Sequence, residues 1–199
     1  RDDRLESVYD AGNIVSQYRH RQSQAELFGG WSPGLIDGWV QRVSLGIALQ
    51  DDAYAFEPGV TAPAALPGDQ RLATPFVRYE LLEDRYEKEL NRNLIGRPEF
   101  FSLGFASRLQ IGRASRGFGS STDAWVYAAS LSRGFQPADD QTLITAAQLT
   151  GQRSGGLVQR QQLGLQAQYY VPQGKRWLFF AGAAGDTLTR PVLEDLLQL

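Results

Sequence analysis

The sequence predicts an all-β, antiparallel, up-and-down fold of about eight strands. Apolar and polar residues alternate with a period of two over most of the chain, which is typical of strands with one apolar and one polar face. Segments rich in glycine and proline separate the patterned stretches. No run of apolar residues approaches the ~18 that a membrane-spanning helix needs, so we expect no such helix.

The clearest predicted strand runs from Trp39 to Asp51, with mainly apolar odd positions and polar or small even positions. The segment from Asn13 to Gly30 has the length of a strand but carries polar residues on both faces. We count it as the first strand, because its length fits even though its pattern is weak. The full set of predicted strands is 13–30, 39–51, 76–82, 101–111, 125–135, 141–151, 157–171 and 177–185.

The connections between these strands are expected to alternate in length. Short connections fall at 32–38, 91–97, 136–139 and 172–174, longer ones at 57–73 and 113–121, and an intermediate one at 152–156. Tight turns at one end and loops at the other are typical of an up-and-down meander. The segment from Glu83 to Arg92 is charged on both parities, so we expect it either to project on the short-turn side or to form a solvated strand.

Composition narrows the classes of function. The chain has 199 residues, the size of one domain spanning 1–199, and a net charge of −2, which argues against nucleic-acid binding. It has no cysteine and one histidine, His20, which we expect to be solvated because no Ser–Asp arrangement accompanies it in the sequence. We therefore expect no catalytic residue, no metal site and no cofactor, and no enzymatic activity.

Periodicity alone does not show which way the apolar face points. A soluble barrel turns it inward, whereas a membrane barrel turns it toward lipid. The polar faces here are rich in Gln, Ser and Gly, and the whole chain has only two lysines, Lys88 and Lys175, which is few for a water-exposed sheet. Large aromatic residues on the apolar parity cluster near strand ends, as in the aromatic girdles of membrane barrels. We therefore favour a transmembrane barrel over a soluble one.

This prediction assigns side chains to three environments. The residues expected to face the lumen are Arg42, Arg108, Arg160, Gln162 and Gln166. Those expected to face lipid are Val43, Leu45, Ile47, Leu103, Phe105, Leu163 and Leu165. The expected aromatic girdle comprises Trp39, Phe101, Trp125, Phe135, Tyr169 and Trp177.

Several segments resemble the bacterial surface antigen superfamily, the outer-membrane barrel-assembly and two-partner-secretion translocators of the BamA and TamA type. They are Phe76-Val-Arg-Tyr-Glu80, 95–104 (IGRPEFFSLG), 117–121 (GFGSS) and 177–182 (WLFFAG), and the tail 193–199 resembles the approach to that family's lumen loop. The resemblance implies that the strands belong to a larger, sixteen-stranded barrel in the outer membrane of a Gram-negative bacterium. It also implies that the barrel inserts or translocates other proteins.

The partners implied are outer-membrane lipid or lipopolysaccharide and client outer-membrane or secreted proteins, with no nucleic acid. The alternatives are a passive outer-membrane channel or adhesin barrel, and a soluble lipocalin-like binding barrel. We expect the chain to be part of a larger barrel. An open antiparallel sheet should follow, with no ladder joining the segment near Asn13 to the segment near Trp177.

Overall fold

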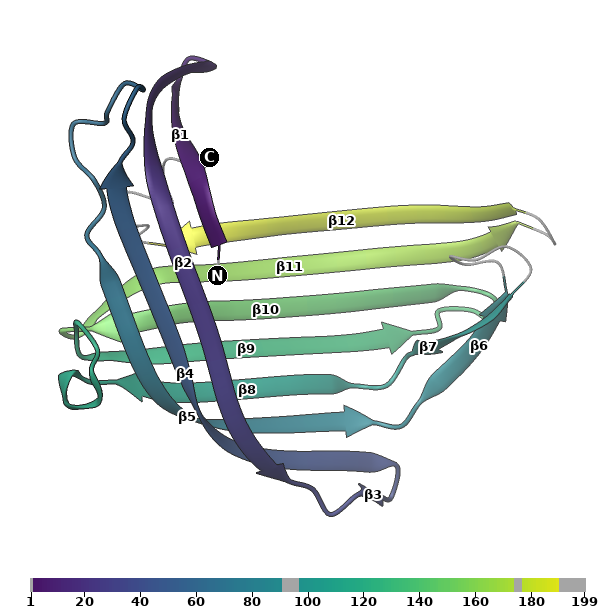
Figure 1. Cartoon of the computed structure of the whole chain (residues 1–199). Helices are drawn as coiled ribbons and strands as arrows, with labels where there is room; N and C mark the ends of the chain where they lie inside the picture. The colour runs from purple at the N-terminus through teal and green to yellow at the C-terminus, as the bar shows by residue number, and fades with distance from the viewer. Residues whose placement is uncertain (1, 91–96, 174–176, 190–199) are drawn as a thin grey trace.

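The computed structural model describes residues 2–90, 97–173 and 177–189, and their fold is almost entirely antiparallel β-structure (Figure 1). One 10-stranded sheet has the order β1-β2-β4-β5-β8-β9-β10-β11-β12, with the short β3 paired to β4. Strands β6 and β7 form a separate two-stranded sheet. The predicted all-β, up-and-down meander is confirmed. None of the described residues lies in a helix that is long and apolar enough to cross a membrane.

The strand bounds are β1 (Asp2–Asp10), β2 (Asn13–Trp31), β3 (Leu35–Ile36), β4 (Trp39–Phe56), β5 (Gln70–Glu83), β6 (Tyr86–Leu90), β7 (Pro98–Ser102), β8 (Ala106–Ala114), β9 (Ala124–Phe135), β10 (Thr142–Ser154), β11 (Leu157–Gln173) and β12 (Trp177–Thr189). A single 3-10 turn, η1 (Arg116–Phe118), lies in the loop between β8 and β9.

The sequence pattern missed β1 because charged residues occupy both of its faces. It pairs with β2 from Asp2↔Gln22 to Asp10↔Asn13, and a tight turn joins the two strands. Ala11 and Gly12 of that turn have φ angles of 47° and 81°, as expected for a two-residue hairpin turn. The segment forms a strand because it pairs with β2, and not because it has an apolar face.

The predicted alternation of connection lengths is wrong at two places. The connection at 152–156 is a two-residue turn, Gly155–Gly156, in which both φ angles are positive. Between β5 and β8 the sequence predicted a short connection at 91–97 followed by a strand at 101–111, but the connection instead contains the β6–β7 hairpin. Both ends of the sheet therefore carry one or more large connections.

The β6–β7 hairpin accounts for the described part of the charged segment Glu83–Arg92; residues 91 and 92 lie outside the described residues. The hairpin leaves the main sheet at the end where β4 begins (Figure 1). Its base is fixed by backbone hydrogen bonds: Asp84 N donates to Gly38 O (2.7 Å), and Gly134 N donates to Leu103 O (3.1 Å). Leu103, expected to face lipid, is only 1% exposed, because the hairpin base packs it against Gly134.

The main sheet is strongly curved (Figure 1): β8 to β12 form one wall, from which β1, β2 and β4 bend away. Leu72, Ala114 and Ala124 form a small apolar cluster on its inner side, next to Val126. Within the described residues no ladder joins β1 to β12. The expected open sheet is thus confirmed for these strands.

Candidate functional site

The two faces of the main sheet have opposite chemistry, and the register defines them. Ser44 pairs with Arg78 across β4 and β5, and Arg78 pairs with Gln110 across β5 and β8. Because directly paired residues share a face, the even-numbered side chains of these strands lie together on what we call the inner face. The odd-numbered side chains lie on the outer face.

The inner face buries polar and charged groups. Arg78, His20 and Asp52 are each 2% exposed. The outer face leaves large apolar side chains in the open: Leu27 is 75% exposed and Leu45 is 63% exposed. Proteins folded in water bury most of their large apolar side chains and leave most charged side chains exposed, so this arrangement is inverted.

Arg78 on β5 is the centre of the buried polar network. Its Nη2 donates to Glu26 Oε1 at 2.7 Å, and its Nε and Nη2 both donate to Gln110 Oε1, at 2.8 and 2.7 Å. The guanidinium also lies over the rings of Phe28 and Phe76, 4.8 and 4.7 Å from their centroids. Hydrogen bonds and cation–π contacts thus compensate for the loss of water around this cation.

His20 belongs to a second inner cluster, and the expectation of a solvated histidine is wrong. Its Nε2 lies 3.1 Å from Asp52 Oδ1, and its ring stacks on Tyr54 at 4.6 Å. Gln22 and Gln50 also donate to the Asp52 carboxylate, at 3.0 and 2.6 Å. The same parity carries these residues on β2 and β4, so the pattern contained this signal, but the polar outer face of β2 obscured it.

The structure brings two of the predicted lumen residues together around Glu80. Arg42 on β4 and Arg108 on β8 are the residues directly opposite Glu80 on the inner face. Arg42 Nη1 lies 3.4 Å from Glu80 Oε2. Gln162 and Gln166 lie on the same face further along the sheet and are exposed.

Arg160 does not follow its parity. The register between β10 and β11 shifts between Thr150 and Gln152, and Arg160, in the bulged part of β11, has a φ of 44°. A bulge interrupts the alternation of side chains, so parity does not define the face of this residue. Arg160 instead helps to line a hollow at the loop end with Asp69 and Gln152.

Of the residues expected to face lipid, most lie on the outer face. Val43, Leu45 and Leu165 are exposed there, Leu163 is 37% exposed, and Ile47 is half-buried. Phe105 is half-buried beside Trp39, at a ring distance of 6.3 Å. Leu103 is the exception described above, because it lies under the hairpin base.

All but one of the residues expected to form an aromatic girdle lie near strand ends on the outer face. Trp39, Phe135, Tyr169 and Trp177 lie on the outer face near the turns at one end, and Trp125 lies near the loops at the other. Phe101 is not among them, because it belongs to β7 in the separate hairpin. The sequence pattern did not single out Trp31, which is 70% exposed at the end of β2.

An ionic network on the outer face limits the apolar surface at the loop end. Arg19 on β2 forms ion pairs with Asp3 at 3.0 Å and Glu57 at 2.6 Å, and Arg21 forms one with Asp3 at 3.2 Å. The hydrogen bond from Arg19 lowers the pKa of the Glu57 carboxyl. Such exposed ion pairs need to be hydrated. On β2 the apolar band of the outer face therefore ends before it reaches Arg21 and Arg19.

The apolar band has a measurable height on β9. Trp125 and Phe135 lie near the two ends of this strand on the outer face. A rise of ~3.4 Å per residue separates them by about 34 Å along the strand. A strand tilt of about 40° would reduce this to about 26 Å, close to the ~25 Å band of membrane barrels.

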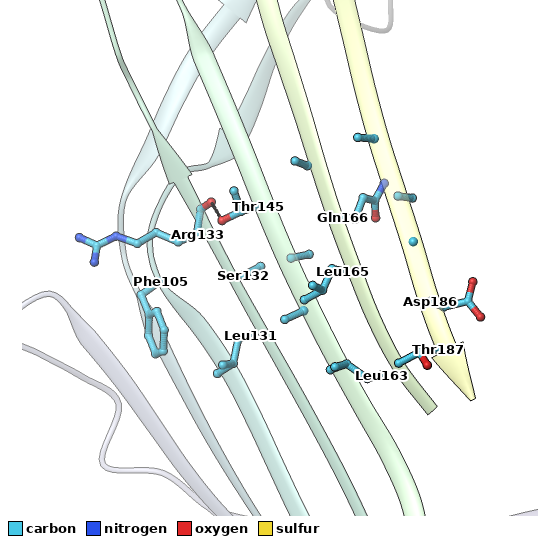
Figure 2. A pocket seen from close by; sticks show the side chains of 16 residues that line it. Phe105, Leu131, Ser132, Arg133, Thr145, Leu163, Leu165, Gln166, Asp186 and Thr187 are labelled. Atoms are coloured by element: carbon cyan, nitrogen blue, oxygen red, sulfur yellow. Dashed lines mark hydrogen bonds between the residues drawn. The ribbon is translucent and has the colours of Figure 1, made fainter. Parts of the chain in front are cut away.

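A shallow apolar hollow of about 790 Å³ lies over β9 to β12 (Figure 2). Leucines border it at Leu131, Leu163 and Leu165. Small outer-face residues line the space between them, namely Ala147, Ala167, Ala183 and Gly185. The hollow results from short side chains on adjacent strands and has little polar lining.

No group of three or more His, Asp or Glu side chains suited to a metal ion occurs among the described residues. No family model matches the chain, and no curated protein matches it. The different chemistry of the two faces of the sheet is therefore the main indication of function.

Proposed function

We propose that this chain forms the wall of a β-barrel in the outer membrane of a Gram-negative bacterium. The observation that carries the proposal is the inverted sheet, with Arg78 buried on the inner face and Leu45 exposed on the outer face. In hydrocarbon an apolar outer face needs no cover, while a polar inner face can border water or an inserted segment. The aromatic residues at both ends of the band support the same proposal, and so does their separation of about 34 Å along β9, which the tilt of about 40° usual in membrane barrels would bring to about 26 Å.

The two edges of the sheet bear on how the wall is completed. The edge strands β1 and β12 do not pair with each other among the described residues. Unpaired backbone groups are costly in hydrocarbon, so a membrane-embedded β12 needs a partner strand. Further barrel strands or an incoming strand of another protein would supply that partner.

Insertion or translocation of other proteins is the more specific proposal, and it follows from the resemblance to barrel-assembly translocators. Among the described residues β12 pairs only with β11, and this favours the translocation proposal over a passive channel, because an available edge can receive a client strand. A photo-crosslinking residue at Ala181 of β12 should therefore capture an unfolded outer-membrane client. The matched position Ala147 in β10, which has neighbours on both sides, should not. Crosslinks from Ala181 only to another strand of the barrel would favour a closed, passive barrel.

The membrane topology is tested with single cysteines, because the chain has none of its own. Ala64→Cys lies in the loop between β4 and β5, and Ala138→Cys lies between β9 and β10 at the opposite end. We expect an impermeant maleimide on intact cells to label Ala64→Cys and to label Ala138→Cys only after permeabilisation, since the longer loops of such barrels are extracellular. The reverse pattern would invert the orientation, and labelling of both on intact cells would contradict a membrane-spanning sheet.

A further inference from the structure

Three outer-face residues form a row across three adjacent strands at the loop end. Arg113 on β8 is directly opposite Trp125 on β9, and Trp125 is directly opposite Arg153 on β10. The Arg113 guanidinium lies over the Trp125 ring, 5.2 Å from its centroid. Adjacent strands are ~4.8 Å apart, so the two arginine backbones lie about 10 Å apart with the indole between them.

Both arginine side chains are available to a ligand. Arg113 and Arg153 are exposed, and in the described part of the chain neither forms an ion pair with a carboxylate. Asp123, close to the row, accepts a hydrogen bond from Arg116 N at 3.1 Å and lies 4.0 Å from the Arg116 guanidinium; its carboxylate also attracts Arg113, from beyond ion-pair distance. Arg153 Nε donates to the Gly156 carbonyl at 3.3 Å, which holds its side chain toward the turn between β10 and β11.

The position of the row in the sheet determines which part of a lipid molecule it could contact. Trp125 marks the loop-end limit of the apolar band, so the row lies at the depth of lipid headgroups under the proposed function. Toward the membrane centre, the outer face continues through Ala129 and Leu131 to the apolar hollow over β9–β12. On β9 the hollow begins at Leu131, about 20 Å along the strand from Trp125 at ~3.4 Å per residue. Cations at the end of such an apolar surface complement a phosphorylated headgroup above acyl chains.

We propose that Arg113, Trp125 and Arg153 bind the phosphorylated headgroup of lipid A, with its acyl chains lying along the apolar outer face of β9 and β10 toward the hollow over β9–β12. The inference rests on the proposed function, because it requires this end of the sheet to lie at the outer leaflet. In this site the two guanidinium groups donate hydrogen bonds to phosphate oxygens, and the cation–π contact with Trp125 orients the Arg113 side chain.

The test measures lipid A binding to the detergent-refolded protein by native mass spectrometry, with membrane insertion into vesicles measured in parallel. The variant is Arg113→Gln/Arg153→Gln. The matched control is Arg108→Gln, which removes an exposed arginine from the inner face of β8, the strand that also carries Arg113. We expect the double variant to bind bisphosphorylated lipid A about tenfold more weakly and the control to bind it within about twofold of the unaltered protein.

Dephosphorylated lipid A should bind the unaltered protein and the double variant equally. Competition by millimolar inorganic phosphate alone would show that free phosphate, and not a lipid, is the ligand, and would overturn the proposal. Normal vesicle insertion with unchanged lipid A binding by the double variant would refute the lipid site and leave the proposed function standing. Failure of the unaltered protein to insert into any vesicle, tested with the strands that complete the barrel present, would refute both.

Discussion

Replacing Leu165 with arginine should sharply reduce the fraction of the protein that inserts into lipid vesicles. Leu165 is 57% exposed on the outer face of β11 and borders the apolar hollow (Figure 2). A cation on the lipid face near mid-depth costs about 2–4 kcal/mol. Urea titration of folding into vesicles, followed by tryptophan fluorescence, measures this loss as a lower free energy of unfolding.

The neighbouring substitution Gln166→Arg is the control, because Gln166 is exposed on the inner face of the same strand. Its effect should be below about 1 kcal/mol, since the new cation remains in a polar environment. Gly46 is unsuitable as an inner-face control, because a Cβ there would lie 2.5 Å from Leu27 O and 2.7 Å from Phe76 Cζ. Equal losses at 165 and 166 would contradict the assignment of the two faces.

Glu26→Ala should destabilise the protein by about 1.5–3 kcal/mol, because it removes the only carboxylate that pairs with the buried Arg78 among the described residues. The side chain of Arg78 is 3% exposed and that of Glu26 is 35% exposed, so water compensates only in part for the lost partner. Adding Arg78→Met to Glu26→Ala should restore most of the stability, since a buried ion pair and an apolar replacement have similar net free energies. Urea-dependent unfolding of the single and double variants measures both effects.

The matched control for this pair is Glu80→Ala. Arg42, the partner of Glu80 at 3.4 Å, has a side chain that is 47% exposed, so its loss of a carboxylate should cost at most about 1 kcal/mol. A double variant no more stable than Glu26→Ala would contradict the account of Arg78 as an uncompensated buried charge. It would indicate instead that the guanidinium contributes through its packing between Phe28 and Phe76.

Sequence reasoning succeeded where a strand repeats its pattern over many residues. The predicted strands at 39–51, 125–135 and 157–171 each fall inside an observed strand, because alternation over such a length fits no other regular structure. It failed at β1 and β7, where strand formation depends on pairing with a neighbour and not on an apolar face. It also failed at Phe101 and Leu103. Their alternation predicted one continuous strand from 101 to 111, but the chain ends β7 at Ser102 and begins β8 at Ala106.

For the candidate sites too, the sequence predicted what depends on local alternation and missed what depends on tertiary packing. Parity predicted that Arg42, Arg108 and Gln166 would share a polar face, and the register places them together. Parity did not predict the depth of Arg78 or the burial of His20, because burial depends on how the sheet curves. Neither did it align Arg113, Trp125 and Arg153, since they lie on three strands separated by loops whose lengths do not specify register.

The sequence by itself determined that this protein is an antiparallel meander with one apolar and one polar face, because the period of two is a local property of the strand backbone. Only the tertiary structure decided which face is inside. The curvature of the sheet places Arg78 and Asp52 on the inner side and leaves Leu45 and Leu165 outside. Which face lies inside depends on residues far apart in the sequence. It follows from the coiling of many paired strands and from polar groups that meet only when the sheet curves.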